Sequence, residues 1–283
     1  WALALGQLAQ ARTQAEEATR LADDEGDEMA RVEAAVILAE MELQADNLNA
    51  AVAAYNQALA LAQACEATTA ELLATLGLGR ILLRRGLWEE AANAHQEALP
   101  RLRATEDVAA LGLAQLGLGE AKRNLGDLMA AQRAFNEAQR LFTASDDALG
   151  LIEAWRGEAR TLMVAPELEA AVGRYTQAIK RLTQVGEHVA DLEARASLFD
   201  AQALLYAETI YALASEQSAT RATELARDYG GRAGKAGRAA LTQRLREYEQ
   251  TLKATDADVP EEEAHRNKTT AQALAAIRKV IGK

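Results

Sequence analysis

Residues 71–99 read ELLATLGLGRILLRRGLWEEAANAHQEAL, and this stretch decides the fold. Its apolar residues recur every three to four positions on both sides of residues 86–88, Gly-Leu-Trp. This spacing predicts two short amphipathic helices joined by a tight turn. The small residues Gly79, Ala91 and Ala98 stand where two such helices would come closest. The stretch therefore predicts a pair of closely packed antiparallel helices.

The same unit returns along the chain every 40 residues. Two series of alanines show this spacing: Ala11, Ala51, Ala91, Ala131 and Ala171, and Ala18, Ala58, Ala98, Ala138 and Ala178. The turn position keeps the same phase, as Gly6, Asp46, Gly86, Gly126 and Pro166. A position that is large in all repeats but the first does so too, as Ala15, Tyr55, His95, Phe135 and Tyr175. Because turn and core positions stay in phase, the pattern predicts a stack of helix pairs that bury their apolar faces on each other.

The composition agrees with an all-α chain. Of the 283 residues 49% are hydrophobic, mostly Ala and Leu, and only 4% are aromatic, which favours closely packed helices over a β core. The net charge of −11 disfavours a general nucleic-acid-binding surface. The single Cys65 fits a reducing cytoplasm. No apolar run approaches the ~18 residues that span a bilayer and no signal peptide is visible, so we expect a cytoplasmic protein without membrane contact.

The repeat pattern divides the chain into four parts. We expect a partial first repeat at 1–27, four 40-residue repeats at 28–187, an atypical elongated repeat at 188–233, and a basic hinge followed by a C-terminal helical hairpin at 234–283. In the atypical repeat, the alanine that corresponds to Ala171 is Ala222, which predicts a first helix about three turns longer. The glycine-rich stretch 230–238 is expected to loosen helical structure. Because the chain begins at Trp1 inside a predicted helix, we also expect it to be a piece of a longer polypeptide.

The order of small and turn residues resembles the tetratricopeptide repeat (TPR). The match runs through Leu78-Gly79, Gly86, Ala91, His95 and Ala98, and its equivalent returns in the next repeat. The period is longer than the usual one of about 34 residues. The resemblance covers roughly residues 1–230. It implies a right-handed α-solenoid whose concave groove, lined by the first helix of each pair, binds a partner protein or peptide.

The register set by Gly79 and Gly119 predicts which side chains face that groove. The candidate partner-binding residues are Arg80, Arg84, Glu120, Arg123, Asn124, Arg156 and Arg160, with Glu33, Glu40, Gln44 and Glu153 beside them. An arginine presents a planar fork of donors that suits the carboxylates or phosphates of a partner. The alternative is a solvated face with local salt bridges, each contributing ~0–1 kcal/mol.

No pattern indicates catalysis, a cofactor or a metal site. His95, His188 and His265 are scattered without metal-ligand spacing, and His95 occupies a helix-packing position. No nucleophile arrangement accompanies Cys65. The glycine-rich stretch lacks the strand and the Gly-Lys-Ser/Thr ending of a phosphate loop. Basic residues exceed acidic ones from Arg221 to Lys253, but stacking aromatics are few, so direct contact with nucleic acid is not expected. We predict that this chain is not an enzyme.

The end of the array carries a second resemblance. Residues 194–199 (ARASLF), 205–208 (LYAE) and 222–227 (ATELAR) look like the last repeat before a CHAT peptidase, a caspase-like cysteine protease domain often attached to bacterial TPR arrays. The predicted hairpin is similar to the connector before that domain. The resemblance implies a regulatory array whose catalytic His and Cys would lie beyond Lys283, gated by a partner such as a nucleic-acid-guided effector complex. The alternative is the ligand-sensing array of a bacterial transcription regulator or signalling ATPase.

Overall fold

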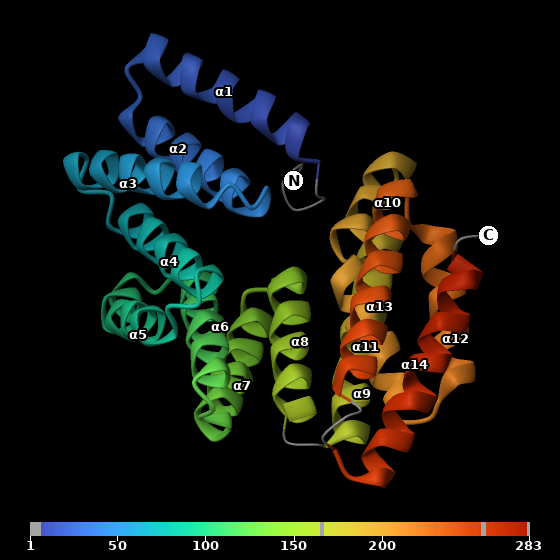
Figure 1. Ribbon diagram of the computed structural model, residues 1–283. Helices are drawn as coiled ribbons and strands as arrows, with labels where there is room; N and C mark the ends of the chain where they lie inside the picture. Colours follow the sequence, from blue (N-terminus) through green and yellow to red (C-terminus); the bar gives the residue numbers. More distant parts are fainter. Residues whose placement is uncertain (1–6, 165–166, 256–258, 282–283) are drawn as a thin grey trace. The chain divides into compact units, whose positions relative to one another are not determined.

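The computed structural model describes residues 7–164, 167–255 and 259–281. Within these ranges the regular structure is entirely α-helical (Figure 1), which confirms the all-α prediction. The helices of the described residues are α1 (Leu8–Glu25), α2 (Glu28–Gln44), α3 (Leu48–Ala64), α4 (Thr68–Arg84), α5 (Trp88–Thr105), α6 (Val108–Asn124), α7 (Leu128–Ala144), α8 (Ala148–Val164), α9 (Leu168–Glu187), α10 (Leu192–Ala201), α11 (Ala203–Ser215), α12 (Ala219–Arg232), α13 (Lys235–Thr255) and α14 (Glu261–Ile281). The predicted turn residues Gly6 and Pro166 lie outside the described residues.

The helices divide into two compact units. One comprises residues 7–158 and the other residues 159–283, and the division falls inside α8. In the first unit each helix packs on its neighbours in sequence, and the first helices of consecutive pairs also touch, α2 with α4 and α4 with α6. This is the solenoid of stacked helix pairs that the sequence predicts.

Tight turns join the two helices of each pair. Gly86 follows α4 with a φ of 76° and Gly126 follows α6 with a φ of 82°, in the left-handed region that glycine adopts without steric cost. Asp46 occupies the same place after α2 with a φ of 61°. Asp127 then caps α7, because its Oδ1 accepts the backbone N–H of Ala130 at 3.0 Å. The turns reverse the chain at once, so the helices of a pair pack against each other.

One ring from the second helix of each pair fills the core of the first unit. Tyr55, His95 and Phe135 are almost completely buried. His95 lies against two glycines, and a Cβ on Gly117 would stand 2.2 Å from its Nε2. A Cβ on Gly157 would likewise stand 2.3 Å from Cε1 of Phe135. The glycines of the first helices therefore form seats, that is, stretches of bare backbone on which these rings pack. The prediction that His95 is a core residue is confirmed.

The second unit has a different centre. Helix α11 packs on α9, α12, α13 and α14, and α13 and α14 form the predicted C-terminal hairpin. Three rings from α10, α11 and α12 pack together. Phe199 contacts Tyr206 edge to face with ring centroids 6.4 Å apart, and the centroids of Tyr206 and Tyr229 are 4.5 Å apart. Phe199 also packs on a glycine, because a Cβ on Gly186 would stand 2.9 Å from its ring, so this cluster adds ring–ring contacts to the ring-on-glycine packing of the first unit.

The predicted long first helix of segment 188–233 is not continuous. It breaks at Gln202, between α10 and α11. The break lets α10 pack on α13 while α11 packs on α9 and α14. No glycine or proline marks the position, and the periodic pattern therefore gave no sign of it.

The expected glycine-rich hinge is wrong for most of its length. Helix α12 continues through Gly230 and Gly231, and α13 begins at Lys235, so only Ala233 and Gly234 are outside helices. The Gly234 N–H donates to Asp200 Oδ1 at 2.7 Å, and a Cβ on Gly237 would stand 2.2 Å from the same oxygen. Gly234 and Gly237 have no side chain and therefore allow α10 to pack closely. Tertiary contacts thus keep Gly237 helical despite the low helix propensity of glycine.

Candidate functional site

An ion pair joins the first helices of two consecutive repeats in the first unit. Arg80 of α4 donates from Nη1 to both carboxylate oxygens of Glu40 on α2, at 2.8 and 2.7 Å. The hydroxyl of Tyr55 on α3 donates to Glu40 Oε2 at 2.6 Å. One carboxylate thus receives hydrogen bonds from α3, the next helix in sequence, and from α4, the first helix of the next pair.

The electrostatics of this cluster keep Glu40 ionised. Burial acts to raise the pKa of the Glu40 carboxyl, but Arg80 and the Tyr55 hydroxyl together hold that pKa below its usual range. Burial and the neighbouring carboxylate raise the pKa of Tyr55, so the phenol stays protonated and remains a donor. At neutral pH the Tyr55–Glu40–Arg80 cluster is therefore a protonated phenol, a carboxylate and a guanidinium.

Two of the predicted groove arginines remain accessible. The side chain of Arg80 is 38% exposed, and its Nε and Nη2 make no hydrogen bond to protein among the described residues, although the Glu153 carboxylate also acts electrostatically on this guanidinium. Arg84, one turn further along α4, is 53% exposed and pairs with Asp46 Oδ1 at 3.3 Å. Arg84 can offer donors to an anionic partner because its exposed ion pair holds it only weakly, and Arg80 can do so through Nε and Nη2 while Nη1 stays on Glu40.

The remaining candidates of the first unit are engaged on their own helices. Arg123 is only 12% exposed and pairs with Glu120 at 2.7 Å, and Asn124 donates to the Glu120 backbone carbonyl at 2.8 Å. Arg156 is 14% exposed and pairs with Glu153 at 3.0 Å. Arg123 and Arg156 therefore present little of themselves to a partner, whereas Asn124 is exposed and uses its amide on its own helix.

Arg160 belongs to the second unit. Its Nε lies 3.7 Å from Oε1 of Glu208, a buried carboxylate on α11. The contact ties α8 to α11 through an acid that would otherwise be costly to bury. Arg160 thus has a structural role inside residues 159–283.

Two features of the site were not predicted from the sequence. Tyr55 reads only as a core ring, although its hydroxyl reaches Glu40. The pairing of Glu40 with Arg80 could have been found from their spacing, since opposite charges occupy the same register in adjacent repeats, as they do for Arg80 and Glu120. The imidazole of His95 lies near this cluster with neither ring nitrogen hydrogen-bonded in the described part of the chain. Burial, together with the charge of Arg80, lowers the pKa of His95 to about 4.

The described residues show neither a metal-binding cluster nor a membrane-spanning helix. They contain no group of three or more His, Cys, Asp or Glu side chains placed to hold a metal ion. None of the described helices has an apolar stretch that would cross a membrane.

The comparisons with known proteins define the fold class. No protein-family model matches the sequence, and no curated protein matches it. Among solved structures, the chain is similar to a Rap protein complexed with competence and sporulation factor, with a TM-score of 0.61 and 16% identity over 99% of this chain and 72% of the Rap chain. It is also similar to BtubC (BKLC) from P. vanneervenii (TM-score 0.54, 19% identity, 81% and 93% coverage) and to the apo form of RapI (0.54, 12%, 98% and 71%). The chain therefore has a TPR-like helical repeat fold.

Proposed function

We propose that this chain is a protein-interaction scaffold that binds an acidic segment of a partner protein or peptide along α4. The observation that carries this proposal is the accessible pair Arg80 and Arg84, one turn apart on a first helix. Arg80 is oriented by Glu40, which leaves two of its donor nitrogens for a ligand. A guanidinium held in this way loses less side-chain freedom on binding a carboxylate.

The fold supports the same proposal. Repeat arrays build extended binding surfaces from equivalent positions of successive helices, and the similar Rap protein was solved in complex with a factor that it binds. Glu40, Arg80 and Glu120 occupy equivalent positions on α2, α4 and α6. A partner lying along these helices would meet alternating charges at this register, with Arg80 between Glu40 and Glu120.

Peptide display tests the proposal directly. Random heptapeptides displayed on phage are selected on the chain, and the enriched peptides are measured by fluorescence anisotropy. We expect enrichment of Asp and Glu. The double variant Arg80→Gln/Arg84→Gln should bind the enriched peptides at least tenfold more weakly, about 1.4 kcal/mol.

Arg140→Gln is the matched control. Arg140 is 66% exposed on α7, a second helix, and is likewise paired with a carboxylate, Glu137. This variant should bind as the parent does, and circular dichroism should show unchanged helicity for both variants. Equal binding by the double variant would remove α4 from the proposed site.

We further propose that the array has a 40-residue period and is the regulatory part of a bacterial, cytoplasmic CHAT-protease-type protein. The three segments that resemble the last repeat before such a domain lie on α10, α11 and α12, followed by the α13–α14 hairpin. A reading frame that encodes a His and a Cys on an α/β domain after Lys283 would support this, and a stop codon there would end it. An upstream ATPase or DNA-binding domain would favour the sensor alternative, and pull-down of a nucleic-acid-guided effector complex would identify that partner.

A further inference from the structure

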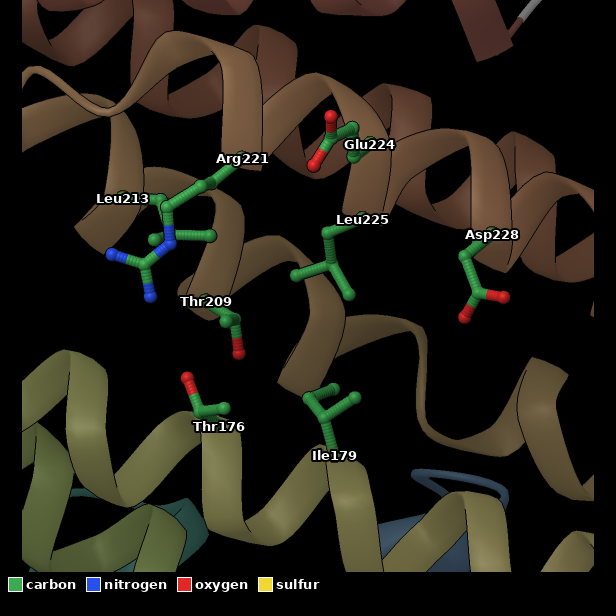
Figure 2. Close-up of a pocket in the computed structure, with 8 residues that line it drawn as sticks. All are labelled: Thr176, Ile179, Thr209, Leu213, Arg221, Glu224, Leu225 and Asp228. Atoms are coloured by element: carbon green, nitrogen blue, oxygen red, sulfur yellow. The ribbon is translucent and has the colours of Figure 1, made fainter.

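A pocket of about 370 Å³ lies between α9, α11 and α12 of the second unit (Figure 2). Its lining residues are Thr176, Ile179, Thr209, Leu213, Arg221, Glu224, Leu225 and Asp228. Figure 2 shows Thr176 pointing from α9 toward Thr209 of α11, and Ile179 pointing from α9 toward Leu225 of α12. The volume falls within the range of ligand pockets, about 300–1,000 Å³.

The inner part of the pocket is apolar. Ile179 and Leu213 are buried and Leu225 is half-buried. The hydroxyls of Thr176 and Thr209 each donate to a carbonyl of their own helix, at 2.7 Å in both cases. With these donors satisfied, an apolar group can enter without leaving a polar hydrogen exposed to it.

The rim of the pocket carries unequal charges. Arg221 has a carboxylate neighbour, Glu216, at 3.5 Å, and Asp228 accepts from Arg232 at 2.9 Å. Glu224, between them on the same face of α12, is exposed and has no ion-pair partner among the described residues. The uncompensated charge at the mouth is therefore negative.

A pocket in the equivalent place of the first unit differs in this respect. It lies between α1, α2 and α3, measures about 190 Å³ and includes Asp23 and Arg31 in its lining. Those two residues pair with each other at 2.8 Å. The charges that line the smaller pocket are thus paired with each other, whereas the larger pocket presents an unpaired carboxylate beside its apolar residues.

We propose that the α9–α11–α12 pocket binds one apolar side chain of a partner polypeptide whose neighbouring residues are basic. The apolar side chain packs on Ile179, Leu213 and Leu225, and a flanking Lys or Arg pairs with Glu224. This site is separate from the arginines of α4 and selects the opposite charge. It gives the array a second contact point on a partner, which would raise avidity without a larger interface.

Methyl NMR with short peptides tests the proposal. The full chain, labelled at Ile and Leu methyls, is titrated with acetyl-Lys-Phe-Lys-amide, acetyl-Glu-Phe-Glu-amide and acetyl-Lys-Gly-Lys-amide. We expect saturable shifts of the Ile179 and Leu225 methyls with the first peptide, binding at least threefold weaker with the second, and no shift with the third. Glu224→Gln should weaken the first peptide three- to tenfold, while Glu169→Gln, an exposed carboxylate of α9 outside the pocket, should change nothing.

Each outcome decides the proposal. Absence of methyl shifts with the Phe-containing peptides would show that the pocket takes no side chain. Equal binding of the acidic and basic peptides, or an unchanged affinity in Glu224→Gln, would overturn the charge selection. The Arg80→Gln/Arg84→Gln variant should bind acetyl-Lys-Phe-Lys-amide normally, so a failure of the α4 site and a failure of this pocket are read separately.

Discussion

The sites of His95 and Phe135 are built alike and filled differently. Each ring comes from the second helix of a pair, is completely buried, and seats on glycines of two first helices. The phenyl ring of Phe135 carries no polar atom, whereas both ring nitrogens of His95 lack a hydrogen bond in the described part of the chain. The comparison separates two contributions, because the shape of the seat is shared and the chemistry of the ring is not. Three kinds of substitution and a change of pH should affect the two sites differently.

Truncation of the ring should have the largest effect. Phe135→Ala leaves a cavity between α6, α7 and α8 and should cost about 3–5 kcal/mol of unfolding free energy. His95→Ala should cost less, because it also removes a polar group whose burial is unfavourable. Urea unfolding followed by circular dichroism measures both. Equal losses would show that the imidazole carries no burial penalty.

Filling the seat should be the next largest effect. Gly117→Ala places a Cβ 2.2 Å from the present position of His95 Nε2, so we expect a loss of about 1–3 kcal/mol from overpacking. Gly173→Ala on α9 is the control, because a Cβ there meets nothing within 4 Å and should stabilise by about 0.5–1 kcal/mol. A neutral Gly117→Ala would mean that the seat yields easily.

Exchange of the ring should stabilise the protein. His95→Phe places in the first seat the ring that the second seat already holds, and removes two buried nitrogens without hydrogen bonds. We expect a gain of about 1–2 kcal/mol at pH 7, measured as a higher urea midpoint at constant m-value. A loss of stability would indicate that the imidazole makes a hydrogen bond, for instance to water, that the phenyl ring cannot replace.

Acid should reveal the same difference. Burial and the charge of Arg80 lower the pKa of His95 from its ordinary value of 6.5 to about 4 in the folded chain, so the unfolded state binds the proton first. Stability should therefore fall as pH drops from about 6.5 toward 4, by at most about 1.4 kcal/mol per pH unit from this residue. Protonation of Glu40 also destabilises the folded chain in acid. The quantity to measure is therefore the difference in unfolding free energy between the parent and His95→Phe. Parallel pH profiles for the two proteins would contradict a neutral buried imidazole.

The local pattern of the sequence was sufficient for the architecture. Apolar residues at helical spacing, Gly86 and Gly126 at turns, and Glu261 to Glu263 at the start of the last helix specify all-α pairs and a terminal hairpin, because each signal acts within a few residues. The register also placed His95 in the core. By contrast, the break at Gln202 and the close packing of Gly234 and Gly237 on Asp200 depend on contacts between residues distant in sequence.

The candidate site likewise has features that the sequence predicts and features that depend on tertiary contacts. From the sequence alone it follows that Arg80, Arg84, Arg123 and Arg156 belong to first helices of successive pairs, since helical periodicity fixes the face on which a side chain stands. The orientation of Arg80 by the Tyr55–Glu40–Arg80 cluster, and the low exposure of the Arg123 and Arg156 side chains, follow from tertiary contacts. Whether a long side chain is exposed or paired depends on distances of a few ångströms between helices, and a one-dimensional pattern holds no such distances.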